Sequence, residues 1–166
     1  MKNNFNINEL NIDVEEDTLK DKYLTFFICN QMFGIAVKDV VQIVGIQEIT
    51  SIPEFPDYAK GIINLRGAII PIIDVRLRLH KEEVAYNDKT CIIVTKIQDS
   101  LIGYIVDAVN EVTNIEKANI SEPPKMGTTY VNKFLIGVAK INDKITLLLD
   151  TQKMLSEEEL ELVSNI

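Results

Sequence analysis

The amino-acid sequence contains an internal repeat, which restricts a chain of this length to folds that have two similar halves. Gly34 is followed by a valine three residues later and by another six residues later, and Gly103 is followed by the same pattern. Further along, the apolar segments that end at Asp74 and Asp150 also correspond. The repeat predicts two related halves, divided near residues 80–89. A pseudo-twofold axis would place Gly34 on Gly103 and Asp74 on Asp150.

Strand-forming residues are abundant, with 25 Ile and 14 Val against only 7 Gly and 5 Pro among 166 residues. β-Branched side chains favour strands, and about five short strands in each half would close most readily into a small barrel. Barrels of under about 75 residues are marginal when alone. We therefore expect an all-β fold of two five-stranded barrels packed around a shared core, the first at about residues 23–80 and the second at about residues 89–155.

Local patterns add detail to this outline. The apolar run 68–73 is expected to fill its own barrel with one side and to face the neighbouring barrel with the other. Short helical turns are expected between strands, and Ser156 with Glu159 has the capping-box spacing that opens a C-terminal helix. Residues 1–22 are acidic and poor in apolar side chains, which predicts a mobile N-terminal arm before a domain spanning residues 23–166.

The net charge is −8, from 17 Lys and Arg against 25 Asp and Glu. Phosphate backbones and anionic lipid surfaces repel such a chain, so direct contact with nucleic acid or membrane is not expected. Residues 1–11 lack the apolar core of a signal peptide, and the longest uncharged run, near 67–73, is too short to cross a bilayer. Cys29 and Cys91 lie in apolar runs and are interpreted as buried free thiols of a cytoplasmic protein.

The sequence gives little support for catalysis. His80 is the single histidine, so no pair of histidines can hold zinc. It lies in the basic run 76–81, which is interpreted as a solvated face. Phosphate-binding and nucleophile-elbow motifs do not occur. We expect no enzyme activity, no cofactor and no metal. An enzyme acting through Asp74 or Asp107 would need a perturbed carboxylate in a cleft, and that alternative stays open.

A β-barrel module for oligonucleotides or another ligand is the alternative function. Such modules use exposed aromatic side chains interleaved with lysine or arginine. Here Tyr23, Phe26 and Phe27 lie together in one expected strand, and the basic run 76–81 contains no aromatic residue. The residue pattern therefore disfavours this alternative.

Three motifs together resemble one known family. The stretch Gly61–Arg76, with the letters GIINLRGAIIPIIDVR, closely resembles the signature of the chemotaxis coupling proteins of the CheW family. Phe33-Gly34-Ile35 before it and Gly103–Asp107 after it fit the same family in order and spacing. The resemblance covers about residues 20–160 and implies two packed five-stranded SH3-like barrels.

The resemblance also implies an adaptor rather than an enzyme. Members of this family link the regulatory domain of the histidine kinase CheA to the cytoplasmic tips of transmembrane chemoreceptors in bacterial chemotaxis. Such a protein is expected to be cytoplasmic and recruited to membrane-associated receptor arrays. Because the chain ends shortly after its second half, a stand-alone coupling protein is expected rather than a piece of the related kinase.

The family binds receptors in the groove between the barrels, and its kinase contacts involve barrel ends. The resemblance transfers the receptor groove to five positions: Val40, Gly61, Arg66, Val109 and Val112. The three valines have a second interpretation as plain core residues. Arg66 is expected to fold back onto a carboxylate or backbone carbonyls and stiffen the groove, and Gly61 to supply a backbone conformation closed to other residues.

One position departs from the family pattern. Many members carry glutamate where this chain has Gln42, so an ion pair with a partner is not expected at that position. The corresponding residue of the second half, Glu111, keeps its charge. We treat both side chains as candidate partner contacts.

Overall fold

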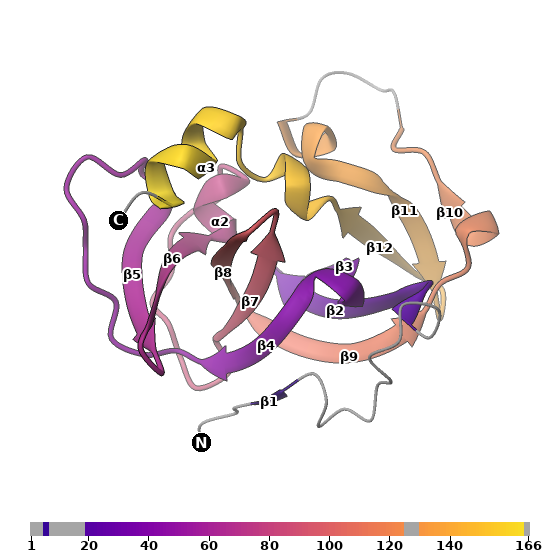
Figure 1. Cartoon of the computed structure of the whole chain (residues 1–166). Coiled ribbons are helices and arrows are strands. Elements are labelled where there is room, and N and C mark those ends of the chain that lie inside the picture. The colour runs from indigo at the N-terminus through magenta and orange to yellow at the C-terminus, as the bar shows by residue number, and fades with distance from the viewer. Residues whose placement is uncertain (1–4, 7–18, 125–129, 165–166) are drawn as a thin grey trace.

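The computed structural model describes residues 5–6, 19–124 and 130–164, which form two packed β-sheets with short helices (Figure 1). The strands, in chain order, are β1 (Phe5–Asn6), β2 (Lys22–Ile28), β3 (Gln31–Ala36), β4 (Val40–Gly45), β5 (Ala59–Leu65), β6 (Ala68–Asp74), β7 (Cys91–Ile97), β8 (Ser100–Val106), β9 (Ala108–Asn114), β10 (Ile120–Ser121), β11 (Leu135–Ile141) and β12 (Lys144–Leu149). The helical segments are η2 (Val37–Asp39), α2 (Val75–Arg78), η3 (Lys117–Asn119), η4 (Tyr130–Phe134), η5 (Thr151–Lys153) and α3 (Glu157–Ser164).

The two sheets share one strand order. Sheet 1 runs β1-β4-β7-β8-β6-β5, and sheet 2 runs β10-β11-β12-β3-β2-β9. Four antiparallel pairs are hairpins: β2–β3, β5–β6, β7–β8 and β11–β12. The pairs β4–β7 and β2–β9 are antiparallel between strands distant in the chain, whereas β6 runs parallel to β8 and β12 runs parallel to β3. The strands of one sheet correspond to those of the other through the sequence repeat: β4 to β9, β7 to β2, β8 to β3, β6 to β12 and β5 to β11. The predicted all-β fold is confirmed.

The two halves of the repeat exchange their first hairpins. β2 and β3, from the first half, lie in sheet 2, and β7 and β8, from the second half, lie in sheet 1. The predicted boundaries at residues 23–80 and 89–155 are therefore wrong. The strands of sheet 2 lie within residues 22–36 and 108–149, and those of sheet 1, apart from β1, lie within residues 40–106. The cause is that each hairpin pairs in parallel with the last strand of the other half, a long-range contact that no local pattern encodes.

The strand register agrees with the predicted equivalence of two glycines. Gly34 lies opposite Leu148 in β12, and Gly103 lies opposite Ile72 in β6. A Cβ atom at Gly34 would lie 2.9 Å from the Leu148 side chain, and one at Gly103 would lie 2.6 Å from the Ile72 side chain. Both glycines therefore leave room for the aliphatic side chain of the parallel neighbour.

Asp74 and Asp150 also take equivalent places. Asp74 is the last residue of β6 and Asp150 directly follows β12, and each carboxylate accepts a hydrogen bond from the backbone N–H two residues later. The distance is 2.9 Å for Asp74 with Arg76 and 2.9 Å for Asp150 with Gln152. Each aspartate caps the helical turn that ends its half of the repeat.

The core has one part inside each sheet and a larger part between the sheets. Ile70 and Ile72 of β6 pack inside sheet 1, whereas the neighbouring Ile73 packs between the sheets. A smaller cluster fills sheet 2: Ile115, Ala139 and Leu148. The expectation that the run 68–73 serves both cores is confirmed for the buried part of that run.

In each sheet, the chain that leaves one edge strand pairs with the strand at the opposite edge. After β4, the backbones of Thr50 and Ile62 exchange two hydrogen bonds of 2.9 Å, which links this segment to β5. In sheet 2, β10 follows β9 in the chain and pairs with β11. These pairings cover backbone groups that an open edge would expose.

A buried arginine of α2 connects the two sheets. Arg78 is 7% exposed, and its guanidinium lies 4.4 Å from the ring centre of Tyr58 and 4.7 Å from that of Phe134. Its Nε atom donates to the carbonyl oxygen of Met154 at 2.5 Å, and its Nη2 atom lies 3.3 Å from a carboxylate oxygen of Glu159. Aromatic faces and oxygen atoms thus compensate the charge that burial would otherwise destabilise.

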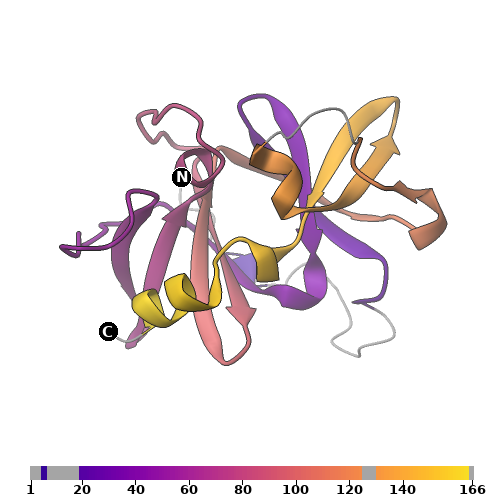
Figure 2. The ribbon, with the colours of Figure 1, turned by 90° about the horizontal axis from the view of Figure 1, so that it is seen from above.

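The C-terminal helix is capped as predicted. The backbone N–H of Glu159 donates to the Ser156 hydroxyl at 3.1 Å, and the backbone N–H of Ser156 donates to the Glu159 carboxylate at 2.9 Å. Figure 2 shows the C-terminal segment leaving β12 in sheet 2 and crossing to sheet 1, where α3 ends. This segment closes the side of the molecule that carries Arg78.

Two smaller interpretations are wrong. The basic run 76–81 is not a solvated face throughout, because Arg78 is buried and Arg76 forms an ion pair with Asp107. Cys91 is buried as expected, but Cys29 is exposed because β2 ends one residue before it and the chain turns there with a φ of 52°.

The predicted N-terminal arm lies mostly outside the described residues, namely 1–4 and 7–18. Phe5 and Asn6 form β1, which pairs with β4. Leu19 packs against the core between the sheets, and the carbonyl oxygen of Asp21 accepts a hydrogen bond from Ile115 N–H at 2.8 Å. Residues 19–22 therefore belong to the folded domain, and its predicted start at residue 23 is wrong.

Candidate docking groove

Two equivalent strands, β4 and β9, each carry a β-bulge at the same position of the repeat. The register of β4 against β7 shifts between Val40 and Gln42, and the register of β9 against β2 shifts opposite Thr25. The Thr25 hydroxyl donates to the carbonyl oxygen of Glu111 at 2.8 Å and accepts from its backbone N–H at 3.2 Å. A bulge bends its strand and changes where the side chains point, so both strands are shaped alike.

A groove of about 440 Å³ lies where these strands meet β2 and the start of β7. Both sheets and the segment before β7 contribute to its walls. Its apolar lining residues are Leu24, Ile43, Cys91, Ala108, Val109 and Val112, and its polar lining residues are Asp88, Lys89, Asn110 and Glu111.

The floor of the groove is part of the buried core, and the apolar surface of the groove is partly open. Leu24 and Ile43 are each 1% exposed and belong to the core between the sheets. Val109 and Val112 are half-buried and pack against that core. Aliphatic surface held in place but incompletely covered is what a partner side chain can bury.

The structure separates the sequence-predicted site residues into two groups. Val109, Val112 and Glu111 line the groove. Val40 is 6% exposed within the core between the sheets, which supports its alternative interpretation as a core residue. Gln42 is half-buried on β4, next to the groove-lining Ile43.

Gly61 lies outside the groove, on β5, where it has a backbone role. Its φ is 142°, and the register of β5 shifts between Ala59 and Gly61. A Cβ atom here would lie 2.0 Å from the carbonyl oxygen of Thr50. The glycine therefore permits the close approach of β5 to the segment after β4, as its predicted conformational role requires.

Arg66 also lies outside the groove lining, at the turn between β5 and β6. It is exposed and has a φ of 54°. Within the described part of the chain, no hydrogen bond or ion pair holds its guanidinium. The structure thus does not show the expected folding back onto a carboxylate.

The sequence reasoning missed the other lining residues of the groove, among them its two floor residues, Ile43 and Leu24. Ile43 is the repeat counterpart of Val112, so the duplication could have identified it. Leu24 enters the groove because it pairs with Val112 across β2 and β9. That contact depends on the hairpin exchange, for which the sequence carried no signal.

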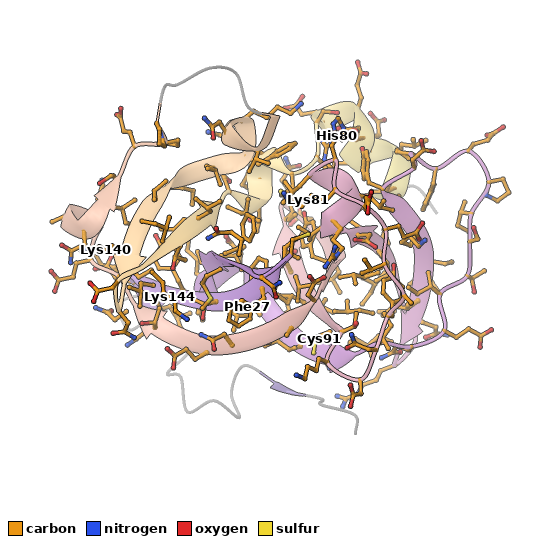
Figure 3. All side chains as sticks on the ribbon, turned by 180° about the vertical axis from the view of Figure 1, so that it is seen from behind. Phe27, His80, Lys81, Cys91, Lys140 and Lys144 are labelled. Carbon is orange, nitrogen blue, oxygen red and sulfur yellow. The ribbon has the colours of Figure 1, made fainter. Side chains whose placement is uncertain are left out.

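A second cavity, of about 430 Å³, lies beside the groove and shares Lys89 and Ala108 with it. Figure 3 shows Phe27, which lines this cavity, at the junction of the two sheets. Arg76 and Asp107 meet here in a two-pronged ion pair, with Nε–Oδ1 at 2.7 Å and Nη2–Oδ2 at 2.6 Å. Asp107 Oδ2 also accepts the backbone N–H of Cys29 at 2.8 Å, so this carboxylate links α2 to the β2–β3 turn.

Asp74 faces the same cavity and is almost fully buried. Its Oδ2 atom accepts the hydroxyl of Tyr86 at 2.8 Å, and its Oδ1 atom caps α2. Burial raises the pKa of Asp74, although the hydrogen bond from Tyr86 opposes the rise. Both carboxylates considered for an enzyme thus make structural contacts. Asp107 binds the turn after β2, and Asp74 binds Tyr86 of the long loop before β7.

Replacing Tyr86 by phenylalanine is expected to lower the free energy of unfolding at pH 7 by about 1.5–3 kcal/mol, because the buried Asp74 carboxylate loses a donor. Protonation favours the folded state as pH falls through the raised pKa of Asp74, since the unfolded carboxyl binds its proton less tightly. A neutral carboxyl also needs the donor less. The difference in free energy of unfolding between Tyr86→Phe and the unmodified protein should therefore become smaller toward acidic pH, as measured by urea unfolding across a pH series.

Tyr104→Phe is the matched control. The Tyr104 hydroxyl is buried and, within the described residues, makes no hydrogen bond. Removing it should change stability little, with no dependence on pH. Equal losses in the two variants at every pH would contradict the role assigned to the Tyr86 hydrogen bond.

The described residues contain no group of three or more His, Cys, Asp or Glu side chains arranged to hold a metal ion. Among the helices described, none is long and apolar enough to span a membrane. The described residues instead form a partly open apolar groove with a polar rim, where the two sheets meet. Such a groove on a rigid scaffold is typical of a protein-interaction domain.

Comparison with known proteins agrees with this class. Residues 22–159 match the family model described as the CheW-like domain, and the chain belongs to the CheW family of chemotaxis adaptor proteins. It is 33% identical over 150 residues to the chemotaxis protein CheW of Klebsiella aerogenes, covering 90% of each chain. It is 29% identical over 138 residues to CheW of Bacillus subtilis, covering 83% of this chain and 88% of the relative.

A solved structure supports the same assignment. The crystal structure of the scaffolding protein TtCheW from Thermoanaerobacter tengcongensis aligns with a TM-score of 0.76 and 34% sequence identity. The alignment covers 84% of this chain and 90% of that one. The resemblance inferred from the sequence motifs is confirmed, and with it the role of a chemotaxis scaffold.

Proposed function

We propose that this protein couples transmembrane chemoreceptors to the histidine kinase CheA, holding a receptor tip in the groove and the regulatory domain of CheA at another surface. Membership of the CheW family supports the adaptor role. The single observation that carries the receptor site is the apolar groove between the sheets, lined by Val109 and Val112. On this proposal the protein is cytoplasmic and joins membrane-associated receptor arrays.

The shape and polarity of the groove suit one face of a helix. A helix presents side chains three and four positions apart, and such a face binds in apolar grooves of other proteins. Val109 and Val112 would cover the apolar part of that face over the floor formed by Leu24 and Ile43. We propose that this contact supplies most of the receptor affinity, because buried aliphatic surface at the centre of an interface dominates its energy.

The rim would contribute orientation rather than affinity. Glu111 is exposed and Lys89 lies on the same rim, so both charges can meet complementary groups of a helix. Exposed ion pairs are worth about 0–1 kcal/mol each, which is enough to set register but not to hold a partner. Gln42 is uncharged and would add at most a hydrogen bond.

Gly61 and Arg66 would act differently from the groove residues. Gly61 positions β5 against the segment after β4, and Arg66 stands exposed at the β5–β6 turn. Neither lines the groove. We therefore propose that they affect receptor binding only through the shape of sheet 1, and that Val40 acts as core.

Two titrations test the proposed function. The protein is titrated by calorimetry with a soluble chemoreceptor-tip fragment and separately with the regulatory domain of CheA. Each partner should bind alone, and the receptor fragment should still bind when the kinase domain is saturating. Failure of both partners to bind would contradict the proposal. A single-stranded oligonucleotide that bound in their place would favour the ligand-binding alternative.

The absence of catalysis is tested in the same instrument. Injection of ATP, GTP or free purines should give no heat beyond dilution, because the described residues show no phosphate-cradling loop. A micromolar nucleotide isotherm would contradict a purely adaptor role.

A further inference from the structure

The short strand β1 pairs with β4, one of the strands that border the groove. Phe5 pairs with Ile43 of β4, and Asn6 pairs with Gln42, in an antiparallel register. Ile43 is also one of the residues that line the groove. The same stretch of β4 therefore borders the groove and holds the N-terminal strand. In Figure 1, β1 runs below β4 and β9, on the side of the molecule opposite α3.

The edge of β4 is a natural place for a strand to bind. β7 covers one side of β4, and the other side faces β1. Without β1, the backbone N–H and C=O groups of β4 on that side would be open to any extended segment. An extended segment added to an exposed sheet edge is a common form of peptide recognition.

We propose that β1, the pair Phe5–Asn6, is a docked strand that competes with the receptor tip for binding beside Ile43. The inference rests on the proposed function, because the competing partner is the receptor. The free protein would then bind receptors through the fraction of molecules in which β1 has left β4. Receptor binding and β1 pairing would exclude one another at Ile43.

The contact is suited to being displaced. A two-residue strand forms few hydrogen bonds, so its intrinsic affinity for β4 is low. Its attachment to the same chain keeps it at a high local concentration, which allows substantial occupancy without tight binding. If β1 pairing excludes the receptor in half to nine-tenths of molecules, the apparent receptor affinity is weakened by about 2- to 10-fold.

The test uses proline in the full-length chain. Proline has no backbone N–H and is excluded from paired strand positions, so the double variant Phe5→Pro/Asn6→Pro should release β1 from β4. The matched control is Asn11→Pro/Ile12→Pro, which makes the same change outside β1. Two measurements are compared: amide hydrogen exchange at Gln42 and Ile43, and calorimetric affinity for the receptor-tip fragment.

The proposal expects faster exchange at whichever of the adjacent Gln42 and Ile43 amides faces β1, while the other, which faces β7, stays protected. Receptor binding in the Phe5/Asn6 variant should also be tighter by about 2- to 10-fold, and neither change should occur in the control. Unchanged exchange would overturn the inference, because β1 would then not protect β4. Faster exchange with unchanged receptor affinity would also overturn it, because pairing and receptor binding would not compete. If neither variant nor the unmodified protein bound the receptor fragment, the proposed function would fail and this inference with it. Equal, measurable affinities would contradict only the inference.

Discussion

Val112→Asp is expected to reduce the affinity for a chemoreceptor tip by roughly 100-fold while the protein stays folded. Val112 lines the groove and is half-buried, so its side chain reaches solvent until a partner covers it. A carboxylate covered without a counter-charge costs several kcal/mol, and about 2.7 kcal/mol corresponds to this factor. Binding to the regulatory domain of CheA should change little, since the proposal places the kinase on another surface. Calorimetry with each partner separates the two effects.

Val138→Asp is the matched control for this change. Val138 is also a half-buried valine of sheet 2, but it lies on β11 and pairs with Leu147, away from the groove. It should leave receptor affinity unchanged. If Val112→Asp instead lowered the melting temperature by many degrees and weakened both partners together, Val112 would be plain core. Full receptor affinity in a folded Val112→Asp protein would exclude the groove as the receptor site.

Gly61→Ala is expected to destabilise the fold by about 2–4 kcal/mol and to weaken both partners to the same extent. The added Cβ atom would lie 2.0 Å from the Thr50 carbonyl oxygen, and the backbone φ of 142° is strained for any L side chain. The β5 edge must then move away from the segment after β4. For a chain of this size the loss corresponds to a fall in melting temperature of roughly 5–15 °C, which thermal unfolding would record.

Gly67→Ala separates the two causes of that loss. Gly67 has a φ of 89°, but a Cβ atom there would have no neighbour within 4 Å. This variant should show only the backbone strain, about 1 kcal/mol. A stable Gly61→Ala protein that lost receptor binding alone would place Gly61 in the interface and contradict its backbone role.

The repeat made much of the fold predictable, because duplicated sequence patterns imply duplicated local geometry. Gly34 and Gly103 show this clearly, since the same spacing places both beneath an aliphatic side chain of a parallel strand. The exchange of hairpins was not predictable in the same way. It depends on which strand lies beside β3 and β8, and parallel neighbours far apart in the chain leave no local spacing to detect.

The candidate site shows the same division between local and long-range information. Val109 and Val112 could be proposed because they lie in a motif, and the groove lining agrees with that proposal. Gly61 and Arg66 lie in an equally strong motif but line no part of the groove. Arg78 escaped attention because nothing in a run of alternating arginines and leucines indicates that one guanidinium is placed between two aromatic rings.

The exchanged hairpins also set an order for synthesis on the ribosome. Apart from β1, sheet 1 is one uninterrupted stretch of chain, residues 40–106, and can assemble once that stretch has emerged. Sheet 2 encloses it in sequence, because β2 and β3 come first but need β9, β11 and β12, which are made last. The first hairpin, β2 and β3, therefore lacks its strand neighbours β9 and β12 until the second half of the chain has been made. A nascent chain that stalls once residues 40–106 have emerged would contain the strands of sheet 1 and a hairpin whose two edges are unpaired. Unpaired strand edges promote aggregation, so this is the form that we expect chaperones to bind.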